Sequence, residues 1–389
     1  MGERAEWDVA VIGGGPAGLA AASASAAAGA RTVVLERAEH PRYKTCGGGL
    51  LGVSLAAVAG QIELPVRDEI RSATFTLRGG REFARSNPEP LLTMVMREEF
   101  DAALLGRAEG NGAVVRQRVQ VRAIEQADGR ATARLADGSS VTATVIIGAD
   151  GSSGVAARHV GAHFAQVDLG LELEIAVPEP VGRQWAGRLA LDWGKIPGSY
   201  GWVFPKGDRL TVGVIAARGQ GDATKAYLRE FVVGLGLDGY ETVRDSGHLT
   251  RCRAEDSPLR QGSVIVAGDA AGLLEPWTRE GISFALRSGA LAGEYAAKAA
   301  TAGDPAATER SLDGYAAAID AALVPDMRAG RVLLTAFTRH AGTFHKGLST
   351  GKGWGTFVKF CRSERSFAEL VNRPAARLAL SLISRLLPG

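Results

Sequence analysis

The first apolar segment of the chain changes from a strand pattern to a helix pattern and then back to a strand pattern. Residues 9–12, Val-Ala-Val-Ile, are uninterruptedly apolar, which is typical of a buried strand. The turn GGGPAG follows at residues 13–18, and the alanine-rich stretch after it predicts a helix that ends at Gly29. Residues 32–35 predict a second strand. A strand, a helix and another strand in this order predict a βαβ unit with a parallel sheet.

The middle of the chain is predicted to contain more strand than helix. Residues 66–92 predict short strands and turns, and the stretch 94–101 predicts the beginning of a helix that reaches about Glu109. Residues 113–147 alternate between apolar and polar side chains, which predicts a β-meander. From about residue 169 to about residue 250 strands and turns replace the helical periodicity, so we expect a mostly antiparallel sheet there.

The last part of the chain returns to helices. Residues 263–267 predict a buried strand, which is followed by a loop and a helix that reaches about Ala300. In the last helix Leu378, Leu382 and Leu386 share one apolar face. We expect this face to pack on the body of the protein, and contact with a membrane surface is the alternative.

Together these elements predict an α/β fold with a Rossmann-like domain, an inserted antiparallel β-sheet domain and C-terminal helices. We expect the chain to divide into 1–165, with a short excursion near 66–92, then 166–254, then 255–303, which returns to the first domain, and finally 304–389.

Composition narrows the functional classes. Of the 389 residues 46% are hydrophobic and 22% charged, which is ordinary for a soluble globular protein. A net charge of +3 is too small to indicate a nucleic-acid partner. Cys46, Cys252 and Cys361 are far apart and show no metal-binding spacing, so we expect a reducing compartment, the cytoplasm. We expect a monomer without a metal, whose membrane contact, if any, is peripheral.

The turn after the first strand carries the clearest chemical signal. Gly13, Gly15 and Gly18 occupy the glycine positions of G-x-G-x-x-G, between a strand and a helix. Gly13 allows the tight turn, Gly15 lets a pyrophosphate approach the backbone, and Gly18 lets the helix pack closely on the sheet. Glu36 ends the second strand, where a carboxylate can accept hydrogen bonds from a ribose. This spacing predicts a dinucleotide site.

A second strand–loop–helix unit indicates which dinucleotide binds. The strand at 263–267 runs into Asp269, and a further glycine, Gly281, precedes Ile282 at the start of the next helix. A nicotinamide dinucleotide needs no second loop of this kind, whereas a flavin has a ribityl chain and a ring to anchor. The first and third regions are therefore predicted to form a Rossmann-like FAD-binding domain.

Two further features allow more than one interpretation. Arg97 stands in the first turn of a predicted helix, where a cation is unfavourable, so we expect it to have an anionic partner. Tyr200, Trp202 and Phe204 alternate along the segment YGWVFP and therefore share one face of a strand. That face either packs in the core or forms the apolar wall of a substrate pocket.

The motif set resembles FAD-dependent oxidoreductases with the para-hydroxybenzoate-hydroxylase-like fold. The segments PRYKTCGGG, at 41–49, and YGWVFP, at 200–205, are similar to two motifs of the geranylgeranyl reductase family. The resemblance covers roughly residues 5–370. The residues that it implies in FAD binding are Gly13, Gly15, Ala17, Gly18, Glu36, Arg37, Gly47, Gly48, Arg97, Val121, Asp269, Gly281 and Ile282. The sequence departs from the family in the bulky Trp277, Arg279 and Glu280, which puts the shape of the loop beside the flavin ring in doubt.

The resemblance also implies a reaction, the saturation of carbon–carbon double bonds in a polyprenyl chain. The substrate would be an isoprenoid diphosphate, a prenylated lipid or a quinone, and the reductant NAD(P)H or ferredoxin. An isolated alkene is not electrophilic, so hydride transfer requires a proton from an acid. Trp202 can stabilise the resulting positive charge, with Tyr200 and Phe204 excluding water. Cys46 either acts near the flavin or fills space, and the acid is not identified by sequence.

Other classes of function remain open at this stage. An aromatic hydroxylase shares the FAD motifs, although Cys46 and the glycines after it count against this interpretation. A flavin-dependent halogenase is disfavoured because Tyr200 and Phe204 replace the Trp and Ile of its W-x-W-x-I-P segment, and because Lys44 lies in the wrong loop. A flavoprotein that binds a lipid or quinone without catalysis is the non-enzymatic alternative.

Overall fold

The computed structural model describes residues 7–127 and 129–373. Its first unit consists of β1 (Trp7–Ile12), α1 (Pro16–Ala27) and β2 (Thr32–Leu35), with β1 and β2 parallel. Gly29 follows α1 with a φ of +85°, the left-handed conformation that favours glycine after a helix. The βαβ unit predicted from the hydrophobic pattern is confirmed.

The first sheet is built around this unit and has eight strands. Five of them are parallel, in the order β18–β11–β1–β2–β8, and β10 and β9 continue from β11 as an antiparallel meander. The added strands are β8 (Val114–Arg116), β9 (Val121–Ala127), β10 (Arg130–Leu135), β11 (Ser140–Gly148), β17 (Arg260–Gln261) and β18 (Val264–Val266). The meander is therefore shorter than predicted, because β8 pairs with β2 along the parallel edge.

Helices pack on this sheet, and they connect its first strands with the segment that returns to it late in the chain. They are α3 (Arg97–Gly110), α4 (Val155–Val160) and α7 (Ile282–Ala300), and a short 3₁₀ turn, η1 (Gly268–Ala271), follows β18. A Cβ atom at Gly289 would lie 2.1 Å from the Ala17 carbonyl oxygen, and one at Gly293 would lie 2.2 Å from that of Ala21. Because α1 and α7 meet through such small residues, the late return segment packs directly on the first helix.

The second sheet has seven strands in the order β16–β12–β15–β14–β13–β5–β6. Neighbouring strands are antiparallel except β13 and β5. The strands are β5 (Ser72–Leu77), β6 (Gly80–Ser86), β12 (Phe164–Ala176), β13 (Arg188–Trp193), β14 (Tyr200–Pro205), β15 (Arg209–Ala217) and β16 (Thr242–Arg253). The predicted short strands within 66–92 thus extend the sheet formed mainly by the later segment.

Two helices interrupt the segment in which the sequence predicted strands and turns. They are α5 (Glu179–Trp185) and α6 (Gly221–Gly234). In α6 only one side is buried, with Tyr227, Leu228 and Val232 packed in the core of the second sheet, and glycines at both ends weaken the helical signal. Its stability comes from this packing more than from local propensity, which is why the pattern did not reveal it.

A small three-stranded sheet lies between the two large ones. It has the order β3–β7–β4 and consists of β3 (Gly49–Leu50), β4 (Val66–Ile70) and β7 (Leu92–Val95), with α2 (Gly52–Val58) after β3. This sheet connects the glycine loop after Cys46 to the strand that leads into α3.

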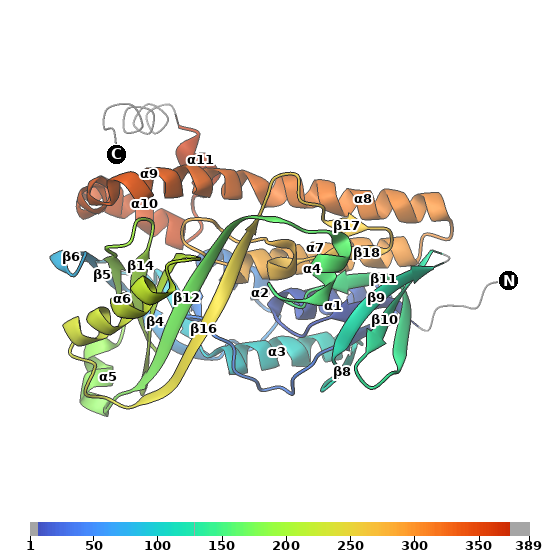
Figure 1. The fold of residues 1–389 in the computed structure, drawn as a ribbon, viewed down its shortest axis with the longest axis horizontal. Helices are drawn as coiled ribbons and strands as arrows, with labels where there is room; N and C mark the ends of the chain where they lie inside the picture. Colours follow the sequence, from blue (N-terminus) through green and yellow to red (C-terminus); the bar gives the residue numbers. More distant parts are fainter. Residues whose placement is uncertain (1–6, 128, 374–389) are drawn as a thin grey trace.

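Four helices complete the described chain. They are α8 (Pro305–Ala322), α9 (Val324–Ser349), α10 (Gly351–Cys361) and α11 (Phe367–Val371). Figure 1 shows α8 and α9 following one another along one side of the molecule, α8 beside the first sheet and α9 beside the second. The predicted apolar face of residues 378–387 lies outside the described residues.

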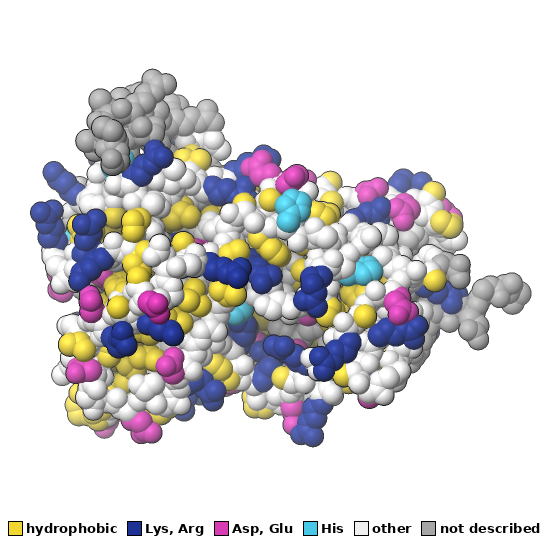
Figure 2. Space-filling model, viewed as in Figure 1, with side chains coloured by type: hydrophobic (Ala, Val, Ile, Leu, Met, Phe, Trp, Pro, Cys, Tyr) yellow, Lys and Arg dark blue, Asp and Glu magenta, His cyan; other side chains and the backbone are white. Residues whose placement is uncertain are grey.

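Among residues 7–127 and 129–373 no helix combines the length and the apolar character needed to cross a bilayer. Figure 2 shows acidic and basic side chains interspersed on the face in view.

Candidate functional site

One cavity of about 1160 Å³ runs between the two large sheets and the C-terminal helices. Almost all residues that the sequence singled out line it. They are Gly13, Gly15, Ala17, Glu36, Arg37, Cys46, Gly47, Gly48, Arg97, Val121, Tyr200, Trp202, Phe204, Asp269, Gly281 and Ile282. The exception is Gly18, on which a Cβ atom would lie 1.9 Å from the Gly13 carbonyl oxygen. Gly18 therefore permits close packing of α1 on the end of β1.

The polar end of the cavity is open at the first turn of α1. Gly15 caps this helix without a side-chain hydrogen bond, and its first turn contains no acidic residue. A Cβ atom on Gly15 would meet only the Arg42 side chain within 4 Å, at 3.6 Å from Nη2. The free N–H groups, the helix dipole and a nearby guanidinium form a cradle that fits a pyrophosphate.

Glu36 is fixed beside that cradle. Its Oε2 accepts a hydrogen bond from the Gly14 N–H at 2.5 Å, and its Oε1 accepts one from the Ala38 N–H at 2.8 Å. The Arg42 Nε atom lies 3.8 Å from Glu36 Oε1. The carboxylate is thus held at the end of β2 in the position that suits a ribose hydroxyl.

Arg97 has the anionic partner that its place in the helix predicted. Its guanidinium donates two hydrogen bonds of 2.9 Å to the two carboxylate oxygens of Asp101, and both residues are buried. Arg42 Nη1 lies 3.4 Å from Asp101 Oδ2. Arg42 and Asp101 were not predicted as site residues, although the i, i+4 spacing of Arg97 and Asp101 was a usable signal.

The glycine loop after Cys46 lies against the aromatic strand. A Cβ atom on Gly47 would lie 2.6 Å from a ring carbon of Phe204 and 3.4 Å from Trp202 Nε1. Gly48 has a φ of +73°, and a Cβ atom there would lie 2.2 Å from the Val95 carbonyl oxygen. Only glycine fits both positions, so this loop is held between β14 and β7.

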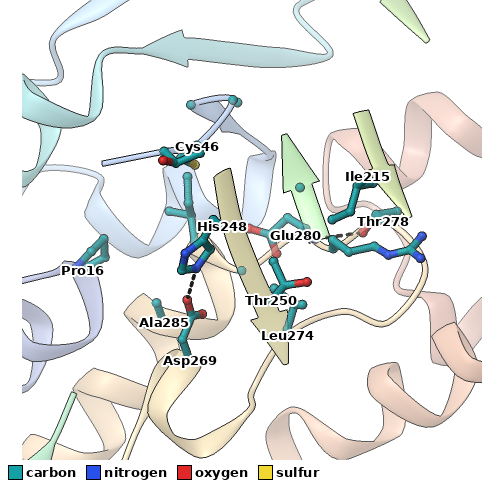
Figure 3. A pocket seen from close by; sticks show the side chains of 18 of the residues that line it. Pro16, Cys46, Ile215, His248, Thr250, Asp269, Leu274, Thr278, Glu280 and Ala285 are labelled. Carbon is teal, nitrogen blue, oxygen red and sulfur yellow. Dashed lines mark hydrogen bonds and ion pairs between the residues drawn. The ribbon is translucent and has the colours of Figure 1, made fainter. Parts of the chain in front are cut away.

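His248 and Asp269 face each other in the middle of the cavity. The His248 Nε2 atom lies 3.6 Å from Asp269 Oδ2, and Figure 3 shows His248 between Cys46 and Asp269. Burial alone would raise the pKa of Asp269, but His248 and Lys44 outweigh burial and lower it. Asp269 is therefore an ionised acceptor. Within the described part of the chain, no three His, Cys, Asp or Glu side chains are grouped to hold a metal ion.

The other end of the cavity is aromatic. The ring centroids of Tyr200 and Trp202 are 5.8 Å apart and those of Trp202 and Phe204 6.4 Å apart, as expected for side chains on one face of a strand. The Trp202 indole N–H is buried and has no hydrogen-bond partner among the described residues. The Tyr200 hydroxyl donates a hydrogen bond to the Thr278 carbonyl oxygen, which joins this strand to the loop before α7.

The bulky residues of that loop have defined partners. Trp277 packs against Phe337, Phe344 and Phe367, with ring centroids 5.6, 5.3 and 5.7 Å away. Arg279 has a φ of +55° and forms a buried ion pair with Asp168, with 3.1 Å between Nε and Oδ2. These side chains anchor the loop to the C-terminal helices and to β12.

The C-terminal helices supply a wall that the sequence did not predict. The leucine and phenylalanine side chains that they contribute to the cavity are Leu333, Phe344, Leu348, Phe357, Phe360, Phe367 and Leu370. Several of these residues follow helical spacing, such as Phe344 and Leu348 at i, i+4. That spacing is typical of one helix face, but it does not indicate which surface the face covers.

Comparison with known proteins agrees with this geometry. Residues 6–174 match the model of the FAD binding domain family. The chain is 30% identical over 363 residues to geranylgeranyl diphosphate reductase of Oryza sativa subsp. japonica, covering 85% of this chain and 75% of the relative. It is 30% identical over 351 residues to digeranylgeranylglycerophospholipid reductase 3 of Methanosphaera stadtmanae, covering 82% and 83%.

A solved structure shares the fold over nearly the whole chain. It is a geranylgeranyl bacteriochlorophyll reductase-like protein from Thermoplasma acidophilum, with a TM-score of 0.74 and 21% identity. The likeness covers 97% of this chain and 96% of that one. The cradle at Gly15 and the second loop at Asp269 fit FAD as the cofactor. The chain belongs to the geranylgeranyl reductase family of FAD-dependent oxidoreductases.

Proposed function

We propose that this protein saturates carbon–carbon double bonds of a polyprenyl chain carried on a diphosphate, a lipid or a quinone. The observation that carries the proposal is the continuity of the cavity, from the pyrophosphate cradle at Gly15 to the aromatic wall of Tyr200, Trp202 and Phe204. A flavin ring extending from the polar end toward Gly281 and Ile282 would adjoin that wall. Relatives named for geranylgeranyl substrates support the assignment.

FAD, once reduced by NAD(P)H or ferredoxin, supplies the hydride. The residues of this chain have three tasks around that transfer. Gly15, Glu36 and Arg42 hold the adenosine end, and the loop at Cys46–Gly48 borders the centre of the cavity. The face of Trp202 stabilises positive charge at the tertiary carbon through a cation–π contact, worth about 2 kcal/mol when desolvated.

The apolar end of the cavity protects that charge from water. Trp277 of the loop before α7, together with Phe344 and the other apolar side chains of the C-terminal helices, lines this end of the cavity. A prenyl chain has no polar group beyond its head group, so a wall of this length suits it better than the single ring of an aromatic hydroxylase substrate.

The proposal is tested with purified holoenzyme reduced under anaerobic conditions. Geranylgeranyl diphosphate, a prenylated phospholipid and a menaquinone are each added, and the products are analysed by mass spectrometry. Gains in steps of two hydrogens on the prenyl chain support the proposal and rank the substrates. Insertion of oxygen into an aromatic compound in air, with no hydrogen gain on any prenyl chain, would replace it with hydroxylation.

A further inference from the structure

A buried carboxyl group lies beside the loop that begins at Cys46. Glu172, on β12, is 1% exposed and lines the cavity. Its Oε1 accepts hydrogen bonds from the Cys46 N–H at 3.1 Å and from the Tyr43 hydroxyl at 3.4 Å. These two bonds fix Oε1 against the loop, while the carboxyl group as a whole lines the cavity.

The sheet register places this carboxyl next to Trp202. Glu172 is opposite Gly213 on β15, and Gly213 is opposite Trp202 on β14. A Cβ atom on Gly213 would lie 2.1 Å from Trp202 Cζ2, so the indole lies across Gly213 in the direction of β12. Glu172 therefore lies on the Trp202 side of the aromatic wall, where we place the alkene.

The charges around Glu172 leave it able to hold a proton. Burial raises the pKa of Glu172 to about 7, with Lys206 opposing and Glu174 reinforcing this shift. Lys206 is engaged by Glu174, with 3.6 Å between Nζ and Oε1. The Cys46 N–H and the Tyr43 hydroxyl also reach the carboxyl and oppose the rise in its pKa, and Ser246 is its register partner on β16. A carboxylic acid with such a pKa is half protonated near neutral pH, as a general acid requires.

A hydrogen-bonded path connects this carboxyl to the edge of the sheet. The Tyr43 hydroxyl oxygen lies 2.8 Å from Ser246 Oγ, and Ser246 is half-buried on the edge strand β16. Burial raises the pKa of Tyr43 to about 12, which keeps this hydroxyl protonated and able to pass a proton on. The guanidinium of Arg244 stacks on the Tyr43 ring, 4.2 Å from its centroid, and holds the ring in place.

We propose that Glu172 is the catalytic acid of the reduction and that Ser246 and Tyr43 return its proton from solvent. The O–H bond of the carboxyl breaks as a C–H bond forms at one alkene carbon, and the other carbon takes the hydride. The carboxylate left behind regains one proton through the Tyr43 hydroxyl. This inference rests on the proposed function, and the experiment below separates the two.

The test compares Glu172→Gln and Tyr43→Phe with Asp245→Asn, which changes an exposed carboxylate next to Ser246. Glu172→Gln keeps an acceptor for the Cys46 N–H but has no acidic proton. We expect about a 10²-fold or larger loss of prenyl reduction, with flavin content and the rate of flavin reduction unchanged. Tyr43→Phe, a milder change, is expected to slow turnover by about tenfold. Asp245→Asn is expected to match the wild type.

A second readout does not depend on turnover. Infrared spectra of the oxidised holoenzyme are recorded across a pH titration, and the wild-type spectra are compared with those of Glu172→Gln. The wild type is expected to show an additional protonated-carboxyl band that disappears as the pH rises through about 7. Glu275, whose pKa burial also raises to about 7, contributes to both proteins and cancels.

The outcomes distinguish the two proposals. If the wild type reduces prenyl chains and Glu172→Gln does so within threefold of its rate, Glu172 is not the acid. If the wild type reduces no prenyl substrate, the proposed function fails. The infrared difference between the wild type and Glu172→Gln then still decides whether Glu172 holds a proton near neutral pH. If the two proteins show no such difference, the inference about Glu172 is wrong, whether or not the proposed function holds.

Discussion

The indole of Trp202 lies directly over Gly213 of the neighbouring strand. A Cβ atom on Gly213 would come within 2.1 Å of Trp202 Cζ2 and 2.5 Å of Cε2. The position of the Trp202 indole therefore depends on the lack of a side chain at Gly213. Gly213→Ala is expected to displace the indole and to cost about 1–3 kcal/mol through overpacking.

That prediction is checked by tryptophan fluorescence, thermal unfolding and the KM for a prenyl substrate. We expect a lower Tm and a KM raised by about tenfold, with FAD content intact because the cradle at Gly15 is remote from Gly213. Gly221→Ala is the matched control, since a Cβ atom there meets nothing within 4 Å. An unchanged KM in Gly213→Ala would mean that the indole does not contact substrate.

Substitutions at two of the fingerprint glycines, Gly15 and Gly18, are expected to have different effects. Gly15→Val should leave the apoprotein folded, because the site faces only Arg42, but should weaken FAD binding by about 10–100-fold. Gly18→Ala should instead lower the free energy of unfolding, since its Cβ meets the Gly13 carbonyl. FAD titration and thermal unfolding of both apoproteins separate the effects. Equal loss of stability in both variants would show that Gly15 has a packing role.

The loop before α7 is expected to depend on its buried ion pair. Asp168 accepts hydrogen bonds from Arg279 and from Gln166, and the side chains of Asp168 and Arg279 are 3% and 4% exposed. Asp168→Asn leaves a buried guanidinium without its counter-charge, which should cost about 3–5 kcal/mol. Urea unfolding measures this loss. Glu125→Gln removes an exposed pair with Arg134 and should leave the free energy of unfolding almost unchanged.

Stability is expected to fall as the pH rises from about 4.5 to about 7. Burial raises the pKa of Glu275 to about 7, whereas a glutamate in an unfolded chain titrates near about 4.3. Between these values the folded protein binds more protons than the unfolded chain, so the free energy of unfolding decreases with pH. Urea unfolding at several pH values should show a smaller decrease in Glu275→Gln. A decrease as steep as that of the wild type would contradict the assignment to Glu275.

The sequence predicted the cofactor end of the site far better than the substrate end. Gly13, Gly15 and Glu36 follow one another within a single βαβ unit, so local spacing determines their geometry. Glu172 and His248 reach the cavity from the neighbouring strands β12 and β16, whose register pairs Glu172 with Ser246 and His248 with Gly170, and local spacing in the sequence does not determine that register. Only one side of the aromatic end of the cavity was predicted from the sequence. The alternation of Tyr200, Trp202 and Phe204 indicated a shared face, but the opposing helices α9–α11 come from distant sequence.

The central claim is that one cavity brings a reduced flavin and a prenyl double bond together. It is tested most directly by an anaerobic single turnover of stoichiometrically reduced holoenzyme with geranylgeranyl diphosphate. Flavin absorbance and product mass are recorded in the same sample. We predict that the oxidised flavin spectrum returns and that the prenyl product gains two hydrogens per flavin oxidised. A flavin that stays reduced while the mass of each prenyl substrate offered is unchanged would contradict the account.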